Sequence, residues 1–157
     1  MNKVIKKGRP KTFNKDQASK IAMETYWKEG IENVSLNEMC RKIGESKPSV
    51  YREYGGEEGL QLAALELYYK HRVEPVAKIL FGAEEILVGI KSAFDFLIND
   101  HFKDEKIVAA CMYNREGMHP SENLSVMCKN FIENKDKEHM SFLKEGLKRA
   151  LDKEDLK

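Results

Sequence analysis

Polar and apolar side chains alternate at helical spacing in the segment 46–54. In a helix, its outward polar face would present Lys47, Ser49, Arg52 and Glu53. Val50 and Tyr54 would lie on the opposite side and anchor the helix to a core. Ammonium, guanidinium and hydroxyl groups donate hydrogen bonds to phosphate oxygens and to base edges in the major groove. This segment therefore favours recognition of double-stranded DNA.

An enzyme would need a nucleophile beside a base, or closely spaced metal ligands. The four histidines form no such spacing and are His71, His101, His119 and His139. His119 could gather a metal with Cys111 and Cys128, but the intervals lack the close ligand pairs of structural zinc sites. We expect no enzymatic activity, no metal and no cofactor.

The cysteines and the apolar runs indicate the compartment. Cys40, Cys111 and Cys128 are too few and too far apart for a disulfide framework, and each falls at an apolar helical position. No run approaches about 18 consecutive apolar residues, and residues 1–11 lack the apolar middle of a secretory signal. We therefore expect buried thiols in a cytoplasmic protein with no membrane segment.

Capping residues and glycines divide the N-terminal part into short helices. Asn14 or Asp16 can cap a first helix that stops at Gly30. Ser35, followed three residues later by Glu38, forms a capping box in which each side chain binds a backbone N–H at the start of a second helix. A first and a second helix are thus marked at their ends.

A tight turn and a third helix should follow. Gly44 permits the left-handed backbone that a tight turn between helices needs. Ser46 can cap the third helix, and Pro48 fits its first turn because the missing N–H would have no helical partner there. The helix should end before Gly55. Three helices with this turn meet the physical requirements of a helix-turn-helix.

Beyond Gly56 the apolar spacing is helical and gives no strand signal, so the fold class is predicted to be all-α. Pro75 should kink the first of these helices, and Asp104 and Ser121 are candidate caps of later ones. The expected helices cover residues 57–80, 83–101, 105–117 and 121 to near the end.

Charge supports a division of the chain at Gly56. Residues 1–56 contain 12 Lys/Arg and 7 Asp/Glu, a net charge of +5, whereas residues 57–157 have a net charge of −4. Residues 1–11 hold five basic residues and no acid, and Gly8 and Pro10 discourage regular structure there. We predict a helix-turn-helix domain at 1–56 with a flexible basic arm at 1–11, followed by a helical domain at 57–157.

A run of residues in the first two fifths of the chain resembles the DNA-binding domain of the TetR family. Many positions agree in order, which makes the resemblance specific. The matching runs are Ala18-x3-Ala22-x3-Tyr26-Trp27-x2-Gly30-Ile31-x2-Val34-Ser35-Leu36, Gly44-Glu45-Ser46-Lys47-Pro48-Ser49-Val50-Tyr51-Arg52-Glu53-Tyr54, Glu58-Gly59-Leu60 and Leu62-Ala63-Ala64-Leu65.

The resemblance implies a sequence-specific DNA-binding transcriptional regulator, a repressor released from a palindromic operator by a small-molecule effector. Ser35 and Tyr51 would contact phosphates, and Arg9 would enter the minor groove. Lys47, Ser49 and Arg52 would lie in the major groove. The full set of implied DNA-binding residues is Arg9, Ser35, Ser46, Lys47, Ser49, Tyr51 and Arg52.

Three acidic residues depart from the family pattern. Glu45 replaces a usually apolar residue, Glu53 stands where His is frequent, and Glu57 stands where a Lys commonly approaches the phosphate backbone. Each adds negative charge near DNA, so we expect modest and strongly salt-sensitive affinity, or a slightly different docking. They also leave open an interaction module whose helix-turn-helix no longer recognises DNA.

The resemblance implies that the second half binds the effector and forms a homodimer. Family members usually continue with two further helices that pack against a second subunit, whereas this chain ends in the charged residues 152–157. The helical domain thus looks shortened or incomplete: either the sequence is truncated or its dimer is built differently. The residues that could line an apolar ligand pocket, although their spacing is also typical of a plain core, are Phe94, Leu97, Met112, Met127 and Phe131.

Overall fold

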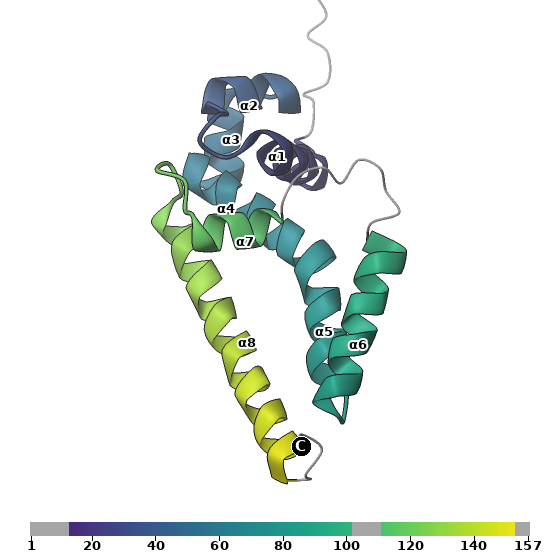
Figure 1. The fold of residues 1–157 in the computed structure, drawn as a ribbon. Helices are drawn as coiled ribbons and strands as arrows, with labels where there is room; N and C mark the ends of the chain where they lie inside the picture. Colours follow the sequence, from purple (N-terminus) through teal and green to yellow (C-terminus); the bar gives the residue numbers. More distant parts are fainter. Residues whose placement is uncertain (1–12, 102–110, 153–157) are drawn as a thin grey trace, which may run out of the picture.

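The structure is a computed structural model that describes residues 13–101 and 111–152. These residues form helices and connecting turns with no strand, which confirms the all-α prediction. Three short helices form a compact end of the molecule, which we call the head (Figure 1). They are α1 (Lys15–Glu29), α2 (Leu36–Ile43) and α3 (Lys47–Tyr54).

The helix ends of the head follow local capping rules. The Asn14 side chain accepts a hydrogen bond from the Gln17 N–H at 3.0 Å, which makes Asn14 rather than Asp16 the cap of α1. Ser35 Oγ accepts from the Glu38 N–H at 3.3 Å at the start of α2. The Glu38 carboxylate lies 3.8 Å from Lys42 Nζ. Glu38 therefore pairs with that lysine, and the predicted capping box is formed only on its Ser35 side.

Gly44 makes the turn between α2 and α3. Its φ of 75° lies in the left-handed region, and its N–H donates to the Cys40 carbonyl oxygen at 2.9 Å. A residue with a Cβ is strained in this conformation, whereas glycine adopts it readily. The glycine lets the chain reverse within the few residues that separate the two helices.

The remainder of the described chain, which we call the body, begins with a long helix interrupted by a wider turn. It consists of α4 (Glu57–Tyr68), the π-helical segment η1 (Tyr69–Val73) and α5 (Glu74–Gly82). Pro75 lacks an N–H, and its ring would clash with the carbonyl four residues earlier in a regular helix. The sequence predicts a kink at Pro75, and the structure has a π-helical segment just before the proline.

Three further helical stretches complete the body and differ in part from the prediction. They are α6 (Ile86–Phe96) with the π-helical segment η2 (Leu97–His101), α7 (Met112–Met118) and α8 (Val126–Asp152). The prediction that the first of these helices begins at residue 83 is wrong, because α6 begins three residues later, at Ile86. Residues 102–110, which include the proposed cap Asp104, lie outside the described residues.

The predicted cap of the last helix is also wrong. Ser125 rather than Ser121 lies at its start, where Ser125 Oγ accepts from the Cys128 N–H at 3.2 Å. Ser121 instead donates to the Glu116 carboxylate from its hydroxyl at 2.9 Å and from its N–H at 3.2 Å. The Glu116 carboxylate on α7 therefore binds Ser121, which the local sequence had suggested as the cap of α8.

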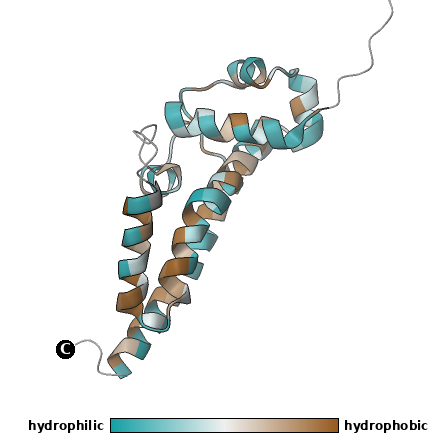
Figure 2. Ribbon diagram, turned by 90° about the vertical axis from the view of Figure 1, so that its right-hand side faces the viewer, coloured by the Kyte–Doolittle hydropathy of each residue, from teal (hydrophilic) through white to brown (hydrophobic). Residues whose placement is uncertain are grey.

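One apolar cluster runs through both the head and the body. Tyr26 and Val50 from the head and Leu65, Met112 and Cys128 from the body all belong to it. In Figure 2 hydrophobic residues lie along the long helices of the body, while the helices of the head are mostly hydrophilic on the side in view. The boundary at Gly56 is thus crossed by a continuous core.

The described helices include none that is both long enough and apolar enough to cross a bilayer. Two of the three cysteines, Cys40 and Cys128, are buried as predicted. Cys111 is only partly buried, because it lies just before the first turn of α7. All three are free thiols.

Candidate nucleic-acid interface

The start of α3 is held by hydrogen bonds between its own serines. Ser46 Oγ accepts from the Ser49 N–H at 3.3 Å, and the two hydroxyl oxygens lie 3.0 Å apart. Pro48 lies in the first turn, where its missing N–H removes no helical hydrogen bond. The first turn of α3 is therefore well defined, as the sequence predicts.

Two side chains attach the opposite face of α3 to the head. Val50 is fully buried in the core. The Tyr54 hydroxyl donates to the Lys15 carbonyl oxygen at 2.9 Å and accepts from Ser19 Oγ at 2.9 Å. Burial is the main reason that the pKa of Tyr54 is raised, so the phenol remains a donor. Both predicted anchors are confirmed, and together they fix the orientation of α3.

The polar side of α3 faces solvent. Ser46, Lys47 and Arg52 are exposed, and Tyr51 is 55% exposed although its ring lies close to Gly56. Ser35, at the start of α2, is exposed as well. Ser49 is half-buried and hydrogen-bonded to Ser46, so it is less outward than the sequence suggested.

The Arg52 guanidinium forms an ion pair with a neighbouring side chain of α3. Arg52 Nε lies 2.9 Å from Glu53 Oε1, with side-chain exposures of 65% and 30%. Glu53 is therefore half-buried rather than fully outward. An exposed pair of this kind contributes little stability, about 0–1 kcal/mol. The guanidinium can exchange this partner for a phosphate or a base edge at small cost.

The basic charge of the N-terminal part is concentrated ahead of α1. The five basic residues of segment 1–11 account for its whole net charge of +5, since residues 13–56 contain seven Lys/Arg and seven Asp/Glu. Arg9, the predicted minor-groove contact, lies outside the described residues. Because the described head has no net charge, general attraction to a polyanion must come mainly from residues 1–11.

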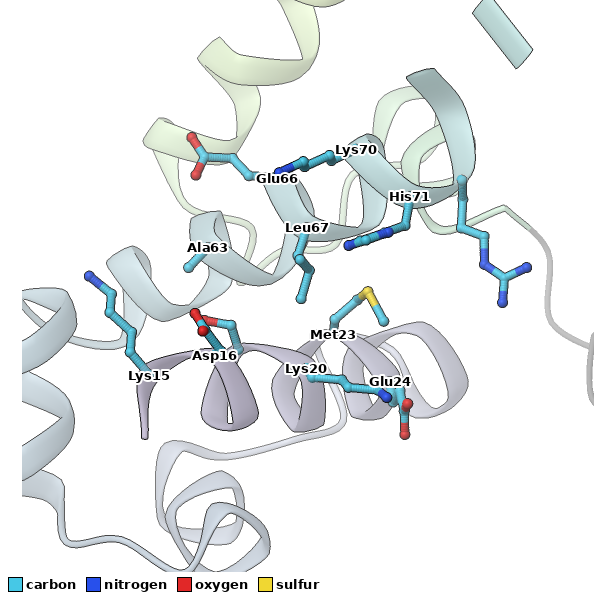
Figure 3. Close-up of a pocket in the computed structure, with 12 residues that line it drawn as sticks. Lys15, Asp16, Lys20, Met23, Glu24, Ala63, Glu66, Leu67, Lys70 and His71 are labelled. Atoms are coloured by element: carbon cyan, nitrogen blue, oxygen red, sulfur yellow. The ribbon is translucent and has the colours of Figure 1, made fainter. Parts of the chain in front are cut away.

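A groove between α1 and α4 offers a contrasting surface. It has a volume of about 940 Å³. Figure 3 shows Met23 and Leu67 between the two helices, with charged residues along the edges. Acids such as Glu24 and Glu66 are interspersed with lysines such as Lys20 and Lys70. Because both signs of charge are present, this groove offers no uniform field to a nucleic acid.

The five residues predicted for a ligand pocket occupy different environments. Phe94 on α6 is 60% exposed and Met127 on α8 is 47% exposed. Met112 is fully buried in the core, and Phe131 packs at its edge against Tyr69 with ring centroids 5.5 Å apart. Leu97 lies in η2 and is half-buried. In the described part of the chain, none of the five lines the groove between α1 and α4, the cavity lined by Glu32 and Val126 or the cavity lined by Tyr69 and Phe142.

Two contacts between segments far apart in the sequence were not predicted, one from the body to the head and one within the body. Arg115 of α7 donates to the carbonyl oxygens of Tyr26 at 3.0 Å and Trp27 at 3.2 Å, near the end of α1. Gln61 of α4 donates to the Asn123 carbonyl oxygen at 3.3 Å and accepts from the Ser125 N–H at 3.2 Å. No local pattern signals such contacts, because each partner lies more than 60 residues away.

The described residues contain no cluster of three or more His, Cys, Asp or Glu side chains suited to a metal ion. The combination of His119 with Cys111 and Cys128 is therefore not such a cluster. His119 is exposed just after α7, whereas Cys128 is buried on α8.

Two curated proteins are related to this chain in sequence. The HTH-type transcriptional repressor ComR of Escherichia coli (strain K12) is 30% identical over 105 residues, which are 67% of this chain and 50% of ComR. The HTH-type transcriptional repressor BdcR of the same organism is 33% identical over 73 residues, 46% of this chain and 37% of BdcR. The chain thus spans half the length of ComR and less of BdcR. No protein-family model matches the chain.

Solved structures share the fold. Two cysteine mutants of the TetR family transcriptional regulator CifR, both determined with 26 bp double-strand operator DNA, superpose with a TM-score of 0.74. The first is 23% identical and is matched over 95% of this chain and 77% of its own; the second is 24% identical and is matched over 94% and 76%. This fold, together with the sequence relationship to helix-turn-helix repressors, supports the resemblance to the TetR family.

Proposed function

We propose that the protein is a sequence-specific DNA-binding transcriptional regulator of the cytoplasm, a repressor that a small-molecule effector releases from its operator. The observation that carries the proposal is the geometry of α3. Val50 and Tyr54 hold one face of it in the head, and Lys47, Tyr51 and Arg52 are presented on the other. A short, rigid helix with exposed donors is suited to the major groove.

The roles proposed for individual residues follow from their exposure and chemistry. Arg52 can offer two parallel N–H groups to a guanine, and Lys47 can donate to a base or a phosphate. The Ser35 hydroxyl accepts from Glu38 as a cap, and its own proton is still able to bind a phosphate oxygen. Ser46 and Ser49 form the first turn that would approach the groove. The proposed minor-groove contact is Arg9.

The names of the relatives support the proposal. ComR and BdcR are described as transcriptional repressors, and CifR was determined with operator DNA. The exposed pair of Arg52 and Glu53 lies on the same surface that DNA would contact. We infer that DNA replaces this weak pair on binding.

We further propose that the protein binds a palindromic operator as a homodimer. Two recognition helices related by a twofold axis contact half-sites about one helical turn apart, so one head alone would bind weakly. Light scattering with and without a selected operator measures the stoichiometry. A 2:1 complex supports the proposal, whereas a 1:1 complex on a palindromic site contradicts it.

Selection of bound fragments from genomic DNA tests the main proposal. A regulator should retain a small set of fragments with a shared inverted repeat as salt rises from about 50 to 200 mM, because base contacts persist while nonspecific attraction is screened. Equal affinity for the recovered fragments and for random DNA would contradict the proposal of sequence-specific binding.

One observation favours a second candidate, an interaction module that does not read DNA. The described head carries no net charge, and Glu53 already neutralises Arg52. On this alternative, every fragment would be lost at modest salt. The same selection experiment therefore separates the two functions.

A further inference from the structure

An aromatic cavity of about 360 Å³ lies between α5 and α8 in the body. Tyr69 and Phe81 line it from the η1–α5 side, and His139 and Phe142 line it from α8. The small residue Ala77 leaves room between them. None of the residues that the sequence suggested for a ligand pocket takes part, so this is a different site.

The rings of the cavity form a connected wall. Tyr69 and His139 have ring centroids 5.9 Å apart and planes 15° apart. Phe81 lies 5.6 Å from His139 and 5.7 Å from Phe142, with planes inclined by 33° and 30°. Because the planes of these neighbouring rings are inclined by small angles, they present flat apolar faces. Such faces favour the binding of a ligand with a planar ring.

The charged residues at this cavity are already paired. Lys78 Nζ lies 3.0 Å from Glu74 Oε1, and Lys135 Nζ lies 2.7 Å from Glu138 Oε2. The Lys135 ammonium also lies 5.3 Å from the centre of the Tyr69 ring, in the position where a ligand cation would gain most. The lining therefore has no net charge to offer an ionic ligand.

The polar groups of the wall are neutral. Tyr69 Oη is hydrogen-bonded to His139 Nε2 at 2.9 Å. Burial lowers the pKa of His139, with Lys135 adding to the effect and Asp136 and Glu138 opposing it. Burial likewise raises the pKa of Tyr69, so both side chains are uncharged at neutral pH. They can exchange hydrogen bonds with an uncharged polar substituent.

The backbone at this cavity is irregular. Tyr69 is the first residue of η1, and π-helical turns in proteins occur frequently at functional sites. The wider turn coincides with the point at which the long helix contributes a buried tyrosine to the cavity.

We propose that this cavity binds an uncharged planar aromatic molecule of one or two rings, and that this molecule is the effector. The volume is near the lower end of the range of about 300–1,000 Å³ for ligand pockets, which sets the size class. The second part rests on the proposed function, since an effector needs a DNA complex to act on.

Calorimetric titration of the full chain with 1-naphthol tests binding without DNA. Saturable binding is expected in the wild type, and Ala77→Trp, which fills the cavity, should weaken it at least about tenfold. Phe142→Ala should weaken it similarly, and because Phe142 is 51% exposed this variant should fold. Leu87→Ala, on α6 and also at a 51% exposed position, is the matched control and should bind normally. No saturable binding, or wild-type binding by both cavity variants, would overturn the site.

Two charged analogues test the ligand class. 1-Naphthoate and (1-naphthylmethyl)trimethylammonium have the same ring system and should bind at least about tenfold more weakly, because the lining offers neither an unpaired cation nor an unpaired anion. Equal or tighter binding of either analogue would contradict the assignment.

A fluorescence anisotropy assay on a selected DNA fragment then tests the effector role. 1-Naphthol should lower the DNA affinity of the wild type and of Leu87→Ala, and leave that of Phe142→Ala unchanged. Ligand binding without any change in DNA affinity would overturn the effector role while leaving the site. A protein that never binds DNA would contradict the proposed function, and the calorimetric result would stand separately.

Discussion

The Arg115 guanidinium donates a 3.0 Å hydrogen bond to the carbonyl oxygen of Tyr26, linking α7 of the body to the end of α1 in the head. The C-terminal end of a helix carries partial negative charge, so a cation there is favourable. Arg115 Nε also lies 3.1 Å from Glu116 Oε1, and the Glu116 side chain is only 1% exposed. One guanidinium therefore neutralises a buried carboxylate and binds the head.

We expect Arg115→Ala to lower the free energy of unfolding by about 2–4 kcal/mol, because it removes the cation paired with the buried Glu116 carboxylate and the two hydrogen bonds that Arg115 donates to α1. Urea denaturation followed by circular dichroism measures the change. Arg52→Ala, at an exposed position, is the control and should change stability by less than about 0.5 kcal/mol. Equal stability of the two variants would show that Arg115 does not hold the head.

The basic arm should control general affinity for DNA. Replacement of its five basic residues by glutamine should weaken binding to random DNA and reduce the slope of log affinity against log salt by up to about 4.5, at about 0.9 for each phosphate that the arm neutralises. Filter binding over a salt series measures the slope. The matched control replaces five exposed cations of α8, which are Lys129, Lys137, Lys144, Lys148 and Arg149. A similar weakening in both variants would mean that only total charge matters.

Arg52 and Tyr51 should contribute differently to DNA recognition. Arg52→Ala should cost about 1–3 kcal/mol on the selected operator and much less on random DNA, if the guanidinium reads a guanine through two hydrogen bonds. Tyr51→Phe removes only the hydroxyl and should weaken both DNAs alike, because a phosphate contact carries no sequence information. Anisotropy titrations on the two DNAs measure both effects. Equal weakening on both DNAs for Arg52→Ala would contradict base reading.

Gly59 should be essential for packing α4 against the end of α3. A Cβ added at Gly59 would clash with the Tyr54 carbonyl oxygen, so the helices would have to separate. We expect Gly59→Ala to destabilise the protein by about 1–3 kcal/mol and to weaken DNA binding. Gly82→Ala is the matched control, since nothing lies within 4 Å of its added Cβ. Thermal unfolding compares the two, and an equal midpoint would disprove the close approach.

His139 should make stability depend on pH below neutrality. Its pKa in the folded protein is lower than its ordinary value of about 6.5, so between these two values the unfolded chain binds more protons. Stability should therefore fall as the pH drops from about 6.5 towards the folded pKa. His139→Gln should flatten this part of the stability profile.

Urea midpoints between pH 5 and pH 8 measure this dependence. His119→Gln changes an exposed histidine and should leave the wild-type profile intact. If the wild type and His139→Gln have parallel profiles, burial of His139 does not control the titration.

The helices of the head could be read from the sequence because their ends are local. Ser35, Gly44 and Ser46 each act on backbone groups a few residues away, so their effect does not depend on the rest of the chain. The outward side of α3 follows from the same spacing, since Val50 and Tyr54 must be on the inner face. The resemblance to a known family added the expected roles of these residues.

Tertiary structure decided the remainder, because most of the deciding partners are distant in sequence. The local sequence predicts Ser121 as a helix cap, but in the structure Ser121 binds the Glu116 carboxylate. Arg115 has the sequence context of an ordinary surface cation, but in the structure it binds the end of α1. The aromatic cavity requires Tyr69 to meet His139 across 70 residues. Local propensity and spacing specify helices and their faces, whereas which faces meet depends on how the whole chain buries its apolar surface.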